Sequence, residues 1–104
     1  MDQRFSNAYI GEKVVLTFDY SAELEAGETL VGTPSVDVKV TLGSDPAPGD
    51  VTNGAPGIVG SAVLLPIDPT VGGVEYRFKM LAPTSNPLKL LACVGKLYVE
   101  AEPA

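Results

Sequence analysis

The feature that most constrains the fold of this chain is a period-two alternation of apolar and polar residues. The alternation is clearest over residues 35–42 and 74–82, and it also runs through residues 12–20. Because successive side chains of a β-strand point to opposite faces of a sheet, the pattern predicts strands with one buried and one solvent-facing side. The residues expected to point inward are Val14, Leu16, Phe18, Tyr20, Val36, Val38, Val40, Leu42, Val74, Tyr76, Phe78 and Met80.

Three more segments are predicted to be strands although their alternation is less regular. Residues 57–65 are small and apolar, and residues 29–33 are expected to add a short strand. Residues 88–100 exceed the usual strand length, so we expect a bend or bulge near Gly95. Residues 83–87 are rich in turn-forming residues and predict a hairpin loop before this last strand.

Residues 19–28 do not fit a strand because they contain good helix formers. Ser21 can cap a helix and Gly27 can end one, which predicts a single helical turn. A turn of this length is not stable in isolation. We therefore expect a short helical crossover between two strands, with Leu24 tucked against the edge of the core.

The number and spacing of these segments indicate an all-β fold. About seven short strands in a chain of 104 residues are typical of an antiparallel two-sheet sandwich of the immunoglobulin-like class. A small barrel is the main alternative. The predicted organisation is an N-terminal arm at residues 1–11, the sandwich at residues 12–100 and a C-terminal tail at residues 101–104.

The composition disfavours most enzyme chemistries. The chain has no histidine and one cysteine, which excludes a histidine-based triad, a histidine metal ligand and an intrachain disulfide. The single Cys93 lies among apolar residues and is expected to be a small buried hydrophobe. A net charge of -6 disfavours nucleic acid and anionic membranes as partners. Neither a signal peptide nor an apolar run of membrane-spanning length is visible, which predicts a protein made in the cytosol.

Acidic residues are the first candidates for a functional site. Asp19, Glu23, Glu25 and Glu28 lie close together in the chain, and carboxylate oxygens bind calcium. The segment lacks the residue spacing of a calcium-binding loop, so a solvated acidic turn is favoured over a weak calcium site. The serines have no histidine to activate them. We therefore expect no catalytic residue, no metal and no cofactor.

Partner contacts are the remaining possibility, and the N-terminal arm is one candidate. It carries Phe5, Tyr9 and Ile10 ahead of the first regular strand. An extended arm with apolar anchors can add to the sheet edge of a neighbouring subunit, or it can fold back on its own sandwich. The sequence favours neither alternative.

The predicted strands contribute further candidates for partner contacts. Val15 is apolar at an outward position, which suggests that another sheet or another subunit covers it. Arg77 and Lys79 occupy outward positions of one strand. They belong either to a mixed-charge solvent face or to a patch that faces a partner.

Several short motifs resemble a known family. They are an aromatic strand end with an acidic turn, a valine-rich strand at residues 36–42, and a strand of the form G-x-x-Y-x-F at residues 73–78. In this arrangement residues 12–100 resemble small tailed-bacteriophage virion proteins of the fiber–tail adaptor type, which have an immunoglobulin-like fold. The residues that carry the resemblance are Asp19, Tyr20, Leu24, Gly27, Glu28 and Tyr76.

The resemblance implies a non-enzymatic structural role. Such a protein sits in the tail or neck of the virion, is assembled in the host cytoplasm, and attaches fibers or links tail components. The implied partners are other virion proteins in a symmetric multi-copy assembly, with no nucleic acid, membrane or cofactor. Two alternatives stay open, namely a capsid decoration protein of the same fold and a carbohydrate-binding module of a host-recognition apparatus. The latter predicts exposed coplanar aromatic side chains.

Overall fold

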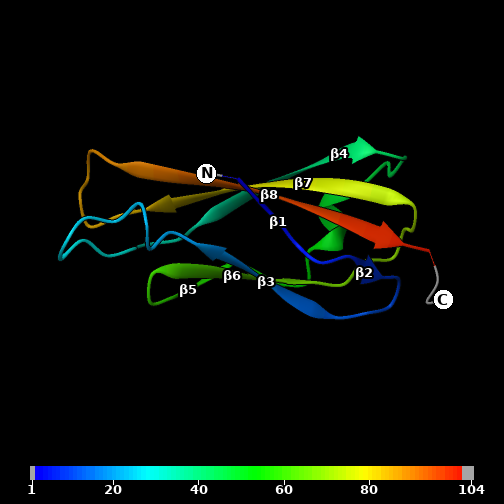
Figure 1. The fold of residues 1–104 in the computed structure, drawn as a ribbon, viewed down its shortest axis with the longest axis horizontal. Helices are drawn as coiled ribbons and strands as arrows, with labels where there is room; N and C mark the ends of the chain where they lie inside the picture. The colour runs from blue at the N-terminus through cyan, green and yellow to red at the C-terminus, as the bar shows by residue number, and fades with distance from the viewer. Residues whose placement is uncertain (1, 102–104) are drawn as a thin grey trace.

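The computed structural model describes residues 2–101 of the chain, with side chains from Gln3 onward. Figure 1 shows two layers of strands that run along the long axis of the molecule. The strands are β1 (Asp2–Arg4), β2 (Ala8–Tyr9), β3 (Val14–Asp19), β4 (Ser35–Leu42), β5 (Gly57–Val59), β6 (Ala62–Ile67), β7 (Val74–Pro83) and β8 (Leu90–Glu100). Among the described residues, the one helical element is the 3₁₀ turn η1 (Pro48–Val51).

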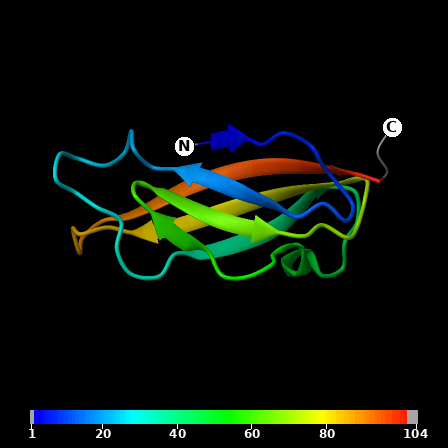
Figure 2. The same ribbon diagram turned by 90° about the horizontal axis from the view of Figure 1, so that it is seen from below.

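The strands form two sheets that pack face to face. The larger sheet has the order β1-β8-β7-β4, with β2 also paired to β8, and the smaller sheet has the order β3-β6-β5. Figure 2 shows the smaller sheet lying over the larger one. All pairs are antiparallel except those of β1 and β2, which run parallel to β8. The prediction of an all-β, two-sheet sandwich is therefore confirmed, and the two sheets do not close into a barrel.

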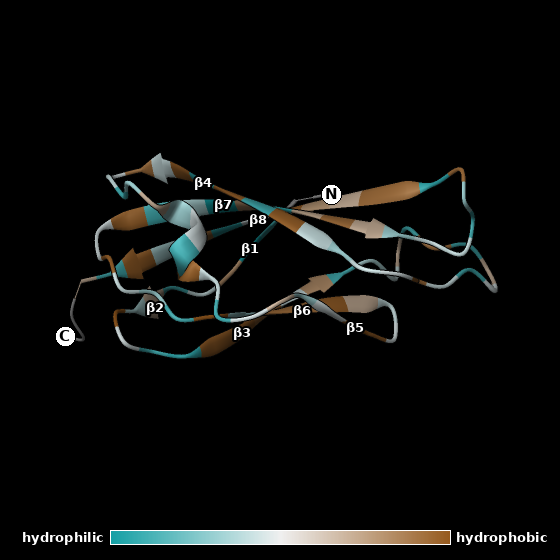
Figure 3. Cartoon of the chain, turned by 180° about the vertical axis from the view of Figure 1, so that it is seen from behind, coloured by the Kyte–Doolittle hydropathy of each residue, from teal (hydrophilic) through white to brown (hydrophobic). Residues whose placement is uncertain are grey.

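The core lies between the sheets and contains the side chains that the alternation predicted to be inward, except Leu42. Phe18, Tyr20, Phe78 and Met80 are fully buried, and Tyr76 is 1% exposed. Figure 3 shows apolar and polar residues interspersed along the strands, as a one-sided burial pattern requires. The valines of β4 are half-buried against this core.

The prediction for Leu42 is wrong, because its side chain is 57% exposed. The pairing of β4 with β7 shifts by one residue between Val40 and Leu42. Such an irregularity reverses the face to which the following side chains point. The alternation in the sequence continues through this position, but the sheet register does not.

The N-terminal arm folds back on its own sandwich. Phe5 packs its ring edge-to-face against Phe18, with 5.2 Å between the ring centroids, and Ala8 is 2% exposed. The arm therefore supplies the edge of the larger sheet through β1 and β2.

Of the predicted bend or bulge near Gly95, the bulge is absent. The pairing of β7 with β8 continues without a register shift from Val74 opposite Val99 to Pro83 opposite Leu90. The need for glycine at position 95 is instead steric, because a Cβ there would collide with the ring of Phe5.

Two other strand predictions differ from the structure. Residues 57–65 form not one strand but the hairpin of β5 and β6, which turns at Gly60 with a φ of 61°. A left-handed φ suits glycine because it has no Cβ. Residues 29–33 form an isolated bridge from Leu30 to Thr84 instead of a strand. The loop predicted between β7 and β8 does join these two strands as a hairpin.

The predicted helical crossover is also wrong, because residues 20–30 form successive turns without a helix. The amide N–H of Glu23 donates to the Tyr20 carbonyl oxygen, and that of Glu28 donates to the Glu25 carbonyl oxygen. Side-chain carboxylates compete for the remaining amides, since Asp19 Oδ1 accepts from Ser21 and Glu28 Oε1 accepts from Glu25. These local bonds favour turns over a helix.

No helix in the described part of the chain is long and apolar enough to cross a membrane. Of the predicted C-terminal tail, only Ala101 belongs to the described residues.

Candidate interaction surface

The outer face of the larger sheet carries four cations in direct cross-strand register. Lys96 of β8 lies opposite Arg4 of β1 on one side and opposite Arg77 of β7 on the other, and Arg77 lies opposite Lys39 of β4. Neighbours along each strand, such as Phe78, point into the core. We call Arg4, Lys96, Arg77 and Lys39 the cation row. At about 4.8 Å between strands, the row spans roughly 14 Å.

The two ends of the cation row have carboxylate partners, whereas its centre has none within the described part of the chain. Arg4 Nη1 lies 3.1 Å from Glu75 Oε1, and Lys39 Nζ lies 3.8 Å from Asp37 Oδ2. Among the described side chains, no carboxylate lies within ion-pair distance of Arg77 or Lys96. Like charges directly opposite each other on a sheet repel. The centre of the row is therefore positioned to attract an external anion.

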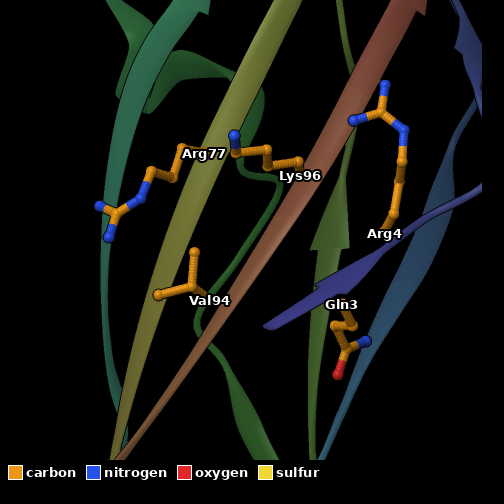
Figure 4. Close-up of a pocket in the computed structure, with 5 residues that line it drawn as sticks. All are labelled: Gln3, Arg4, Arg77, Val94 and Lys96. Carbon is orange, nitrogen blue, oxygen red and sulfur yellow. The ribbon is translucent and has the colours of Figure 1, made fainter. Parts of the chain in front are cut away.

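An open groove of about 490 Å³ lies along the cation row. It is lined by Gln3, Arg4, Arg77, Val94 and Lys96. Figure 4 shows the charged side chains projecting from three neighbouring strands, β1, β8 and β7. The groove is a shallow channel on a sheet face, so it presents charge to a surface or segment instead of enclosing a small molecule.

Gln3 holds β1 in the position that aligns Arg4 with the row. Its Nε2 donates to the Thr17 carbonyl oxygen at 2.8 Å, and its Oε1 accepts from Cys93 Sγ at 3.3 Å. The first bond joins β1 to the smaller sheet and the second joins it to β8. Cys93 is buried, as its apolar neighbours in the sequence predicted.

A second groove, of about 430 Å³, separates β3 from the N-terminal arm. It is lined by residues of both, and Val15 on its β3 side is 57% exposed. No element of the described chain covers Val15. Its exposure agrees with the outward position that the sequence assigned to it.

The residues that the sequence predicted as partner contacts differ in their exposure and do not form one surface. Phe5 is committed to packing within the molecule, and Tyr9 is half-buried in β2, so neither projects as an anchor. Ile10, at 41% exposure, lies beyond them at the end of the arm. Arg77 belongs to the cation row. Lys79 lies two residues further along β7, opposite Val94 of β8 and Asp37 of β4, and is not part of the row.

The acidic residues of 19–28 are occupied by local contacts. Glu28 Oε1 accepts from Lys89 Nζ at 2.7 Å, and this bond lowers the pKa of Glu28 and raises that of Lys89. The Ser21 amide lowers the pKa of Asp19 in the same way. No group of three or more potential metal ligands is present in the part of the chain that the structure describes. Glu23 and Glu25 expose their side chains to solvent.

Tyr20 and Tyr76, which belong to the sequence motifs, are both buried in the core. The buried Tyr20 hydroxyl donates to the Met80 carbonyl oxygen at 2.7 Å, and the Tyr76 hydroxyl donates to Asp45 Oδ2 at 2.5 Å. Burial raises the pKa of both hydroxyl groups well above the ordinary value for tyrosine. Leu24 packs against the core edge as expected, and Gly27 turns the chain with a φ of 78°.

Sequence reasoning missed the cation row as a unit. The alternation places Arg77 on an outward position, but it assigns no face to Lys96, because residues 88–100 do not alternate regularly. Their alignment with Arg4 and Lys39 depends on register, which brings together residues far apart in the chain.

Comparison with known proteins gives no assignment, because the chain matches no family model, no curated protein and no solved structure. Inference about its function therefore starts from its own residues.

Proposed function

We propose that this chain is a non-enzymatic structural protein that acts through protein–protein contacts made by the cation row. The observation that carries the proposal is the alignment of four cations on one open sheet face of a chain whose net charge is -6. Repulsion within such a row costs stability in the isolated molecule. A carboxylate-bearing partner surface offsets that cost, and it also gives binding its orientation.

The distribution of aromatic side chains disfavours the carbohydrate-binding alternative. Four of the seven aromatic residues, Phe18, Tyr20, Tyr76 and Phe78, are 0–1% exposed. The other three, Phe5, Tyr9 and Tyr98, are half-buried. A sugar platform needs exposed aromatic faces, and none of these seven side chains is in the exposed class.

The finer form of the proposal is an adaptor in the tail or neck of a bacteriophage virion. Its support is the sequence resemblance together with the places of the motif residues. Asp19 ends β3 and Tyr20 follows it, Gly27 and Glu28 lie at the end of the acidic turn, and Tyr76 lies near the start of β7. The strand order, with an N-terminal strand parallel to the last strand, also supports an immunoglobulin-like sandwich.

The test of this proposal is the copy number of the protein in purified phage particles. Quantitative mass spectrometry would compare it with the portal protein and the major capsid protein. We expect a copy number that matches a ring of the tail or neck. A ratio that matches the major capsid protein would instead indicate a decoration protein, and absence from the particle would contradict a virion role.

A charge-reversal variant tests whether incorporation into particles depends on the cation row. We expect Lys96→Glu to reduce incorporation, whereas Lys13→Glu makes the same charge change at an exposed site away from the row. Equal incorporation of the two variants would show that the cation row is not the contact surface.

A further inference from the structure

We infer that the cation row binds the acidic loop of a second copy of this chain, defined here as residues 21–28, in a head-to-tail contact. This inference rests on the proposal that the row is a protein-contact surface. It adds the identity of the partner.

The chain carries both halves of a complementary pair. The central cations Arg77 and Lys96 have no carboxylate partner within the described side chains, and Glu23 and Glu25 of the acidic loop are exposed. Glu28 is already paired with Lys89, which leaves the two exposed glutamates as the loop's available charges. The chemistry on both sides is that of an ion pair between an arginine or lysine and a carboxylate.

The two halves cannot meet within one molecule. The acidic loop is joined to the body at Lys89, whose Nζ donates to the Glu23 carbonyl oxygen at 3.1 Å. Lys89 precedes β8, whereas Lys96 lies near the middle of that strand. At ~3.3 Å per residue they are roughly 20 Å apart along the strand. Figure 1 shows the loop, in light blue, at the end of the long axis opposite the end of β8.

The shapes also favour this arrangement. Figure 1 shows the acidic loop projecting from the end of the molecule, whereas Arg4, Arg77 and Lys96 of the cation row line a groove. A face-to-face pair of larger sheets would bring one cation row against another and is disfavoured by repulsion. The contact is therefore heterologous, so each copy offers a row to one neighbour and a loop to the other. Repetition of this contact gives a ring or an open array.

Nucleic acid fits the same surface less well. The chain has a net charge of -6, and Glu75 and Asp37 flank the row and pair with its ends. A phosphate backbone needs a continuous cationic track. An acidic loop needs only the two central cations.

The experiment is sedimentation velocity of the purified chain over a range of concentrations and salt. The Debye length is ~30 Å at about 0.01 M salt and ~8 Å at about 0.15 M, so association should be strongest at the lower ionic strength. We expect the sedimentation coefficient to rise with protein concentration at low salt, and this rise to be lost at high salt. A monomer under all of these conditions would overturn the inference.

Charge reversal identifies the two halves of the contact. We expect Arg77→Glu/Lys96→Glu and Glu23→Lys/Glu25→Lys each to sediment as a monomer. A mixture of the two, or one chain that carries all four changes, should associate again because opposite charges then face each other. Circular dichroism of each variant checks that it is folded.

Matched single substitutions control for net charge. Lys96→Glu is compared with Lys13→Glu, and Glu25→Lys with Asp50→Lys, since all four positions are exposed. We expect only the first member of each pair to lose association. Association that survives reversal of the loop charges, or a failure of the mixture to associate, would overturn the assignment of the loop.

The two alternative partners of the cation row, nucleic acid and a different protein, are tested under the same conditions. Duplex DNA that binds the wild-type chain but not the row variant, without any self-association, would also overturn the inference. If the chain does not self-associate but Lys96→Glu still fails to enter particles, the proposed contact surface stands and its partner is a different protein.

Discussion

At the scale of single residues, Gly95 is where the N-terminal arm meets both sheets. A Cβ at this position would collide with the ring of Phe5, which belongs to the arm, and would lie tightly, at 3.3 Å, against the ring of Phe18, which belongs to β3. The φ of Gly95 is not in the left-handed region, so its backbone is one that other residues adopt. Glycine is therefore required for space and not for conformational freedom.

We expect Gly95→Ala to destabilise the chain by about 1–3 kcal/mol, because inserting a methyl group into packed aromatic rings forces them to move. Chemical denaturation measures the loss. Gly57→Ala is the matched control, since Gly57 also lies in a strand and a Cβ there meets nothing within 4 Å. Equal stability of the two variants would contradict the close packing of Phe5 on Gly95.

The ion pair of Glu28 with Lys89 should make stability depend on pH. The hydrogen bond from Lys89 lowers the pKa of Glu28 below its ordinary value of 4.5. A carboxyl group with a lowered folded-state pKa stabilises the fold above its unfolded pKa, and the effect disappears as the pH falls through the folded pKa. Lys89 has a raised pKa, so its contribution is lost only at alkaline pH above its ordinary value of 10.5.

We therefore expect Glu28→Gln to lower the Tm at neutral pH and to match the wild-type chain once the pH has fallen through the lowered pKa of Glu28, which lies below 4.5. Thermal melts over a pH series measure this convergence. Asp50→Asn serves as the control, because Asp50 is exposed and makes no ion pair with any described residue. A Tm difference that is independent of pH would argue against an ion pair at Glu28.

At the scale of elements, β1 and β2 form the edge of the larger sheet next to β8. They cover the edge of β8, the longest strand, by parallel pairing. Uncovered strand edges are templates for aggregation. The arm thus protects an edge that the remaining strands leave open.

We expect deletion of residues 1–10 to destabilise the fold and to promote aggregation, because it uncovers β8 and removes Phe5 from Phe18. Thermal unfolding and light scattering measure the two effects. The variant Phe5→Ala separates the two causes, because it removes the ring contact with Phe18 but keeps the backbone pairing of β1 with β8. A truncated chain as stable and soluble as the full chain would show that the arm contributes nothing to the sandwich.

At the scale of the whole molecule, charge is distributed unevenly. Four of the seven basic residues form the cation row, although acids outnumber bases by thirteen to seven. The face that holds them is the outer side of the larger sheet. Such a surface is better suited to orienting a partner than to stabilising the isolated fold.

We expect Lys96→Gln to raise the stability of the monomer by about 0.2–1 kcal/mol at low salt, because it relieves repulsion from Arg4 and Arg77. The gain should shrink as salt screens the charges. Denaturation at two ionic strengths, with protein dilute enough to stay monomeric, measures it. Lys13→Gln is the control, and an equal gain there would show that no special repulsion exists within the row.

The strands that the sequence predicted well are those with strict alternation. β3 and β7 have the buried faces expected of them, because side-chain direction along a strand is a local property of the backbone. The failures occur where strand pairing or side-chain hydrogen bonds, and not the alternation, decide the structure. Gly95 lies in an unbroken strand because β7 and β8 keep their register through it, Leu42 is exposed because the register shifts, and residues 20–30 form turns because side-chain carboxylates bind the amides.

By itself, the sequence determined that this chain is a β-rich protein with one apolar face to each regular strand, and it placed Arg77 on an outward position but assigned no face to Lys96. Only the tertiary structure decided that these two cations lie opposite each other and in line with Arg4 and Lys39. The reason is physical. Alternation is set by neighbouring residues, whereas cross-strand register is set by the fit of whole sheets, turns and edge strands that are remote in the chain.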